Sequence, residues 1–372
     1  MRRTFAVLAL VASVTTSAQA QRAWQTEFGI QGGYTRLVQA GSGGEPFDAF
    51  SLPGFNLGPV FPGTSGLYAI FPFKNKLAVE TDVAASQLTS GGSATFVALG
   101  LRGNYAFSKG LYAAVGGALS YSNGLIVNET QLGIQAAVGY RRRLADPLNG
   151  RLEARATLWG KAANVPPQNA YALLIGVSTA TSSGEARAER GAPPTPTRTR
   201  TGRAWTTQLG VAGGYANVHQ VGGFDLTALA LPSYGGGLGS ALGAPDIVLP
   251  PTMFAIIPLG AKLAVEPGLD INRFQNAGTT DFSGNLSMRF DYAVRGGWYG
   301  ALGGNLHYIK STGVAAVTRT GINLAWGYRF GLTGPLGGRM EANYTMFGAK
   351  SSAFIAPVNT LGLMFGVLMP LK

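Results

Sequence analysis

Charged residues that could do chemistry recur at a spacing of two along the chain. Glu80 and Asp82 fall on one face of a strand at this spacing, so their carboxylates could form an acid–base pair. Arg151 and Glu153 repeat the spacing with opposite charges, which favours an ion pair. The full candidate set is Glu80, Asp82, Arg102, Arg141, Arg151, Glu153, Glu266, Asp270, Arg289, Arg329, Arg339 and Glu341. An unpaired buried charge is costly, so we expect a Glu–Arg network that either braces the fold or selects small ions at a constriction.

Other kinds of catalytic or cofactor site have little support. The chain has no Cys and only two His, His219 and His307, which excludes thiolate sites and multi-His metal sites. No nucleophile-elbow or phosphate-loop motif appears. The net charge of +12 is not gathered on a basic helix or a stacking platform. We therefore predict a protein that is not an enzyme, with no catalytic residues, no cofactor, no metal and no nucleic-acid partner.

The elements that must position these charges are strands. Apolar and polar residues alternate with a period of two, as in the segment from Leu132 to Tyr140. Predicted strands cover 23–34, 66–73, 76–87, 95–107, 110–122, 131–142, 150–161, 170–180, 204–215, 252–259, 262–273, 284–294, 297–309, 320–330, 338–349 and 360–369. Most reach the length of about 9–11 residues that a tilted strand needs to cross a bilayer. Tight turns such as 74–75 alternate with longer loops such as 35–65, as in outer-membrane barrels.

The chain also contains an internal repeat. Lys76–Glu80 (KLAVE) recurs as Lys262–Glu266, and Gly110–Tyr121 resembles Gly297–Tyr308. Residues 181–202 between the copies are rich in Pro, Thr and Arg, which predicts an extended linker. A basic start, a short apolar run and the small residues around Ala20 predict a secretory signal peptide at 1–20. The expected units are the signal peptide 1–20, repeat 21–180, linker 181–202 and repeat 203–372.

Composition agrees with a membrane barrel. Charged residues make up 12% of the chain, about half the share usual in soluble domains, and 55 residues are Gly. With a signal peptide, eight alternating strands per copy and unequal loops, each copy resembles the small OmpA/OmpX-type outer-membrane β-barrel proteins. That resemblance implies an all-β, antiparallel, up-and-down transmembrane barrel in the cell outer membrane. It also implies two partners, the outer-membrane lipid and the insertion machinery.

Sixteen strands allow two architectures. The linker and the many small inward residues favour two tandem eight-stranded barrels, because an eight-stranded interior is just filled by side chains. One porin-like barrel of sixteen strands is the alternative, since the copies are alike and either arrangement pairs every edge.

The first long loop of each copy is unusually apolar. We expect it either to pack on the barrel rim or to form a surface for an apolar ligand or partner. The residues concerned are Phe47, Phe50, Phe55, Phe61, Phe224, Leu229 and Tyr234. We thus predict a structural or surface-interacting outer-membrane protein whose lumen is closed by the Glu/Arg network. The alternatives are a passive channel for small hydrophilic solutes and an apolar-ligand carrier.

Overall fold

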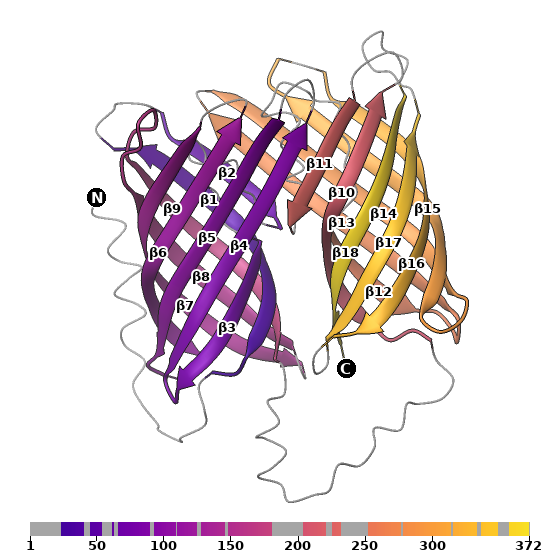
Figure 1. The fold of residues 1–372 in the computed structure, drawn as a ribbon, viewed down its shortest axis with the longest axis horizontal. Helices are drawn as coiled ribbons and strands as arrows, with labels where there is room; N and C mark the ends of the chain where they lie inside the picture. Colours follow the sequence, from indigo (N-terminus) through magenta and orange to yellow (C-terminus); the bar gives the residue numbers. More distant parts are fainter. Residues whose placement is uncertain are drawn as a thin grey trace, which may run out of the picture.

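The computed structural model describes residues 24–40, 45–53, 62, 66–89, 93–108, 110–124, 128–145, 148–180, 204–220, 225–231, 252–276, 278–313, 315–332, 336–348 and 357–371. Their regular elements are strands (Figure 1). None of these residues lies in a helix long and apolar enough to cross a membrane. The expected signal peptide and linker lie outside the described residues.

Within the described residues, eighteen strands follow one another. Those of the first half are β1 (Glu27–Gln39), β2 (Phe47–Leu52), β3 (Leu67–Lys74), β4 (Leu77–Thr89), β5 (Ser93–Ala106), β6 (Leu111–Gly124), β7 (Glu129–Ala145), β8 (Leu148–Trp159) and β9 (Gln168–Ala180). Those of the second half are β10 (Gln208–Gln220), β11 (Asp225–Leu231), β12 (Met253–Pro258), β13 (Leu263–Asn276), β14 (Thr279–Ala293), β15 (Trp298–Ser311), β16 (Val317–Gly331), β17 (Gly337–Phe347) and β18 (Val358–Pro370).

Alternation along each strand decides which side chains enter the barrel. On β5 the outward Leu101 is 60% exposed, whereas its neighbour Arg102 is 1% exposed. The same two-residue period continues through Gly103 and Asn104, of which only Asn104 is buried. Small and apolar residues therefore cover much of the outside, and charged residues such as Glu80 and Arg102 are turned inward.

Consecutive long strands pair as antiparallel neighbours in each half. β4 to β9 form one such series, and β1 closes it by pairing with β9 over residues 27–39. β13 to β18 form the second series, which β10 closes by pairing with β18. The predicted all-β antiparallel fold is confirmed.

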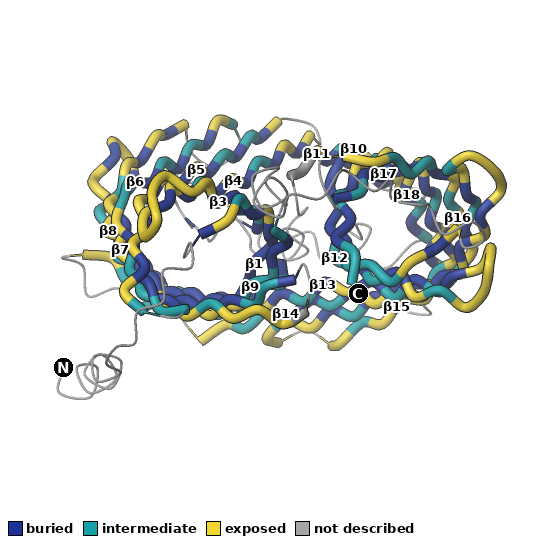
Figure 2. The backbone as a smooth tube through the Cα atoms, turned by 90° about the horizontal axis from the view of Figure 1, so that it is seen from below, coloured by how far each residue is buried: buried dark blue, intermediate teal, exposed yellow. Residues whose placement is uncertain are grey.

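Two short strands join the halves. The upper part of β1 pairs with β2, whose other edge pairs with β13 of the second half. Likewise β10 pairs with β11, whose other edge pairs with β4 of the first half. Toward the lower end of Figure 1, β3 connects β1 to β4, and β12 connects β10 to β13. The two halves therefore lie side by side when seen from below (Figure 2), and their strands belong to one closed barrel.

This arrangement corrects the leading prediction of two separate eight-stranded barrels. The finding supports the alternative, one closed barrel of the sixteen predicted strands, with β2 and β11 as additional short strands. β2 and β11, of 6 and 7 residues, lie inside segments that the sequence assigned to long loops. Residues on either side of the crossing form one apolar cluster that includes Ala49, Leu88 and Ala228.

Candidate functional site: ion-paired clusters inside the barrel

The first cluster consists of Glu80, Arg102, Arg151, Glu153 and Arg155, all of them buried. Arg102 binds both carboxylates: its Nη1 lies 2.8 Å from Glu153 Oε1, and its Nη2 contacts Glu80 Oε1. Arg151 bridges the same two carboxylates, with its Nη1 2.8 Å from Glu80 Oε1. Arg155 donates from its Nε to Glu153 Oε1 at 2.8 Å. Each carboxylate therefore contacts at least two guanidinium groups.

Neutral side chains complete the coordination of the first cluster. The Tyr112 hydroxyl donates to Glu153 Oε2 at 2.6 Å, and the Asn104 amide donates to Glu80 Oε2 at 2.7 Å. The Arg151 guanidinium also lies 4.4 Å from the centre of the Tyr68 ring, a cation–π contact. Asp82 Oδ2 lies 3.7 Å from both Arg102 and Arg155. Three arginines thus face three carboxylates, so the cluster is close to neutral.

Strand register brings these residues together. Glu80 on β4 is directly opposite Arg102 on β5, whereas Arg151, Glu153 and Arg155 approach from β8. Glycine makes room on the neighbouring strands: a Cβ at Gly139 would overlap the Tyr112 ring. The inward small residues therefore allow long polar side chains to reach one another inside a narrow ring.

The second cluster consists of Glu266, Arg289, Asp291, Arg339 and Glu341, again all buried. Arg289 Nη1 lies 2.7 Å from Glu341 Oε1, and its Nη2 lies 2.9 Å from Glu266 Oε1. Arg339 contacts the same two carboxylates, and Asp291 Oδ1 lies 3.3 Å from Arg289 Nε. The Tyr299 hydroxyl donates to Glu341 at 2.6 Å, as Tyr112 does to Glu153.

Three of the proposed network residues lie elsewhere. Arg141 is near the lower end, where its Nη2 is 2.8 Å from Glu27 Oε1. Arg329 lies at the corresponding place in the second half and donates to the Ala204 carbonyl oxygen at 2.7 Å. Asp270 instead accepts hydrogen bonds from the backbone N–H and hydroxyl of Thr252, at 2.9 and 2.7 Å. The sequence pattern placed these side chains on the inward face, but it did not show how far along the barrel axis they lie.

Several cluster members were not among the sequence candidates. They are Asn104, Tyr112, Arg155, Asp291 and Tyr299. A signal for the tyrosines existed, because Tyr112 and Tyr299 occupy the same position in the repeated segments Gly110–Tyr121 and Gly297–Tyr308. Arg155 had no such signal, since the second copy has Asn343 at its place.

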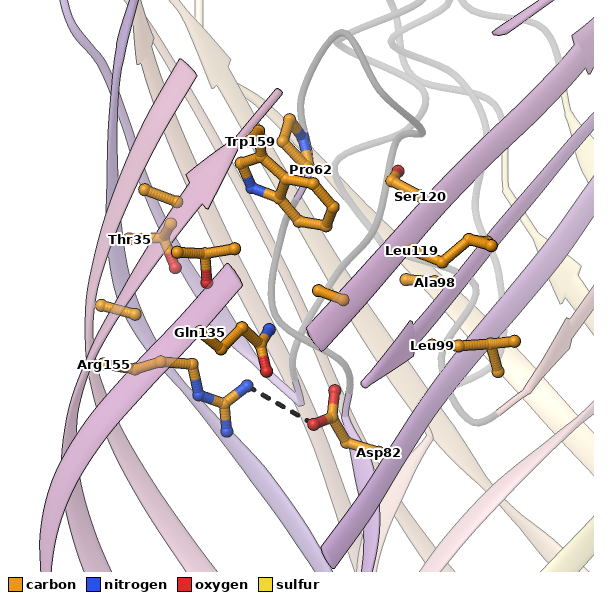
Figure 3. A pocket seen from close by; sticks show the side chains of 14 residues that line it. Thr35, Pro62, Asp82, Ala98, Leu99, Leu119, Ser120, Gln135, Arg155 and Trp159 are labelled. Atoms are coloured by element: carbon orange, nitrogen blue, oxygen red, sulfur yellow. Dashed lines mark ion pairs between the residues drawn. The ribbon is translucent and has the colours of Figure 1, made fainter. Parts of the chain in front are cut away.

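A small cavity lies beside the first cluster (Figure 3). Asp82 and Arg155 face each other across it, and Gln135, Trp159 and Pro62 form other parts of its wall. Its volume is about 20 Å³, room for about one water molecule. Side chains therefore occupy most of the space at this level of the first half.

Residues expected to form an apolar loop surface lie instead on short strands, as far as the structure describes them. Phe47 and Phe50 belong to β2, and Leu229 belongs to β11. The Phe47 ring stacks on that of Phe274 in β13, with 5.9 Å between ring centroids. Leu229 is 47% exposed on the outside. The remaining residues of that prediction, Phe55, Phe61, Phe224 and Tyr234, lie outside the described residues.

The two histidines have separate environments. His307 is buried on β15, directly opposite Arg319 of β16. His219 is exposed and contacts the Asp225 carboxylate. Among the described residues, no group of three or more His, Asp or Glu side chains is arranged to hold a metal ion.

Comparison with known proteins gives structural neighbours only. No protein family and no curated protein matches the chain. Similar solved structures include the CymD monoaromatic hydrocarbon channel, at 9% identity and a TM-score of 0.31, with 94% of this chain and 89% of that chain covered. An outer membrane channel from Pseudomonas putida F1 has 11% identity and a TM-score of 0.25, with 96% and 100% covered. Ail, the attachment invasion locus protein of Yersinia pestis, has 12% identity and a TM-score of 0.25, with 42% and 99% covered.

Proposed function

We propose that the chain is an integral outer-membrane β-barrel protein with a structural or surface-interacting role. Its outside supports contact with lipid: Val115, Leu132 and Ile134 are 64%, 65% and 66% exposed on outward positions. Exposed apolar surface of this extent marks an interface with lipid or protein. Lipid cannot satisfy open backbone groups, and a closed sheet leaves few of them.

Aromatic residues near the lower strand ends support the same placement. Phe73 is 70% exposed, and Tyr105 and Phe107 are about half exposed. In the second half Trp298 stacks on Trp326 and contacts Tyr328, with ring centroids 6.2 and 5.0 Å apart. Such rings are favoured where the hydrocarbon region of a membrane meets water. The outer-membrane lipid and the insertion machinery are thus the partners we propose.

The closed-lumen part of the proposal rests on one observation, the ion pairs that cross the inside of each half. Arg102 and Arg289 each bind two carboxylates on opposite strands while almost fully buried. Moving such a side chain aside would strand charges in a medium of low dielectric, which costs several kcal/mol. We therefore expect the inside of both halves of the wild-type barrel to be closed to solutes.

A bilayer recording tests this proposal. The wild-type protein in a planar membrane should show no stepwise conductance. The double variant Arg289→Ala with Glu341→Ala removes one pair and leaves Glu266 with Arg339, and it should open stepwise conductance. The variant Arg273→Ala, at an exposed site on β13, is the control and should stay silent. Stable stepwise conductance in the wild type would reject the closed lumen.

A passive channel for small hydrophilic solutes is the second candidate. One observation favours it in the second half, where Asn343 takes the place of Arg155 and the cluster has two arginines instead of three. Asn305 and Asn323, which are buried, add polar inward groups on β15 and β16. If the wild type conducts, an effect of Glu341→Ala on ion selectivity would assign the path to this half.

A further inference from the structure

A cavity of about 500 Å³ lies at the lower end of the second half. Its wall includes the basic residues Lys262, Arg295 and Arg329 and the apolar residues Val294, Phe330 and Leu368. No described residue in its wall is an aspartate or a glutamate. The cavity therefore combines three positive charges with an apolar side and lacks a compensating carboxylate among these residues.

Arg329 forms no ion pair with a described carboxylate, and the acidic charges that act on it are those of Asp291 and Glu266. Its guanidinium stacks on the Trp205 ring at 3.7 Å, and its Nη2 donates to the Ala204 carbonyl oxygen. The buried Nε has no hydrogen-bond partner. Lys262 lies 6.0 Å from the Tyr292 ring centre, and among the described residues neither it nor Arg295 forms an ion pair. Within the described part of the chain, three cationic groups thus share this cavity without an ion pair, and this favours an acceptor there.

In the first half, the arginine that corresponds to Arg329 is Arg141, and it forms an ion pair. There Arg141 pairs with Glu27 at 2.8 Å, and the Ser178 hydroxyl donates to the same carboxylate at 2.7 Å. In the second half Gln208 takes the place of Glu27, three residues after the tryptophan in each copy. Leu368 takes the place of Ser178, as their equivalent pairing with Gly210 and Gly29 shows. The second copy thus has the arginine but neither the carboxylate nor its hydrogen-bond donor at these positions.

We propose that this cavity binds a phosphate group, with Arg329, Lys262 and Arg295 as its cationic ligands. Arginine presents a planar fork of donors that suits phosphate oxygens, and lysine adds a point charge. The volume exceeds that of a single phosphate, and the apolar wall of Val294, Phe330 and Leu368 fits a glycerol backbone. Free phosphate and the headgroup of an anionic phospholipid share this chemistry. The lipid source rests on the proposed membrane placement, whereas phosphate binding itself does not.

Calorimetric titration of the full-length protein in detergent with inorganic phosphate tests the site. The wild type should bind phosphate at this site, and Arg329→Gln should weaken binding about tenfold or more, as expected for a charged hydrogen-bond donor. Gln208→Glu should weaken it similarly, because it rebuilds the carboxylate that neutralises Arg141 in the first half. Arg273→Gln, an exposed arginine on β13, is the charge-matched control and should bind as the wild type does. Heat-modifiable gel mobility checks that each variant is folded.

A second arm distinguishes the sources of phosphate. In nanodiscs that contain phosphatidylglycerol, phosphate binding should be weaker than in phosphatidylcholine nanodiscs if the lipid headgroup occupies the cavity. Equal binding in the two would assign the site to free phosphate. Failure of the wild type to bind phosphate in detergent would overturn the proposal, and so would binding that neither Arg329→Gln nor Gln208→Glu weakens. Neither result would bear on conductance, so the proposed function is tested separately.

Discussion

At the scale of single residues, Glu153 is the central acceptor of the first cluster. It contacts Arg102, Arg151 and Arg155, and it accepts a hydrogen bond from the Tyr112 hydroxyl. The corresponding Glu341 contacts two arginines and Tyr299. Both copies thus place a glutamate between two arginines and a tyrosine, and only the first copy has a third arginine, Arg155.

Replacing Glu153 by Gln should destabilise the folded protein by about 3–5 kcal/mol, because three buried guanidinium groups lose a shared charge partner. Urea unfolding of the protein in lipid vesicles, followed by gel mobility, measures the change. Glu45→Gln is the matched control, since Glu45 is exposed, and it should shift stability by less than about 0.5 kcal/mol. Equal stability of the wild type and Glu153→Gln would mean that the ion pairs contribute nothing to the fold.

At the scale of elements, the exchange of β2 and β11 is what joins the halves. In two separate barrels, β2 would pair with β4 of its own half; in the structure, β11 takes that edge of β4. Register places Thr227 of β11 opposite Thr89 of β4, and Asp48 occupies the position of Thr227 in the first copy. The two architectures therefore give Thr89 different neighbours.

Cysteine cross-linking separates these architectures, and the chain has no Cys to interfere. Thr89→Cys with Thr227→Cys should form a disulfide on mild oxidation, because opposite residues of antiparallel strands lie within disulfide reach. Thr89→Cys with Asp48→Cys should not. After the chain is cleaved in the linker, the two halves run as one band on a non-reducing gel if a disulfide joins them, and as two bands after reduction. The reverse pattern of cross-links would return the protein to two separate barrels.

The sequence was informative about strands and less so about their partners. Long alternating segments such as 131–142 predicted β7 because one face had to be apolar and the other polar. β2 and β11 are too short for that period to stand out inside a long loop. Their choice of partner was also hidden, since Thr89 meets Asp48 or Thr227 in the same register and the local pattern suits either. Glu80 and Arg102 could be placed inside the barrel, but the height of Arg141 depended on tertiary structure.

At the scale of the whole molecule, two surfaces of opposite character have to be kept apart. The outside carries Leu101, Val115 and Ile134, each at least 60% exposed, whereas the ion-paired charges of the two clusters face inward. In water this arrangement would expose a broad apolar surface, which favours aggregation. In a bilayer the same surface is solvated by hydrocarbon, so the medium outside the barrel decides the sign of its contribution to stability.

An arginine on the outer surface distinguishes the two media. Leu101→Arg, near the middle of β5, should destabilise the protein in vesicles by about 2–4 kcal/mol, because its charge would lie in the hydrocarbon core. Leu332→Arg, at the lower end after β16, should cost only about 0–1 kcal/mol, since the side chain reaches the interface. Folding titrations in vesicles compare the two variants with the wild type. A cost that is the same at both depths would show that water, and not lipid, surrounds this face of the barrel.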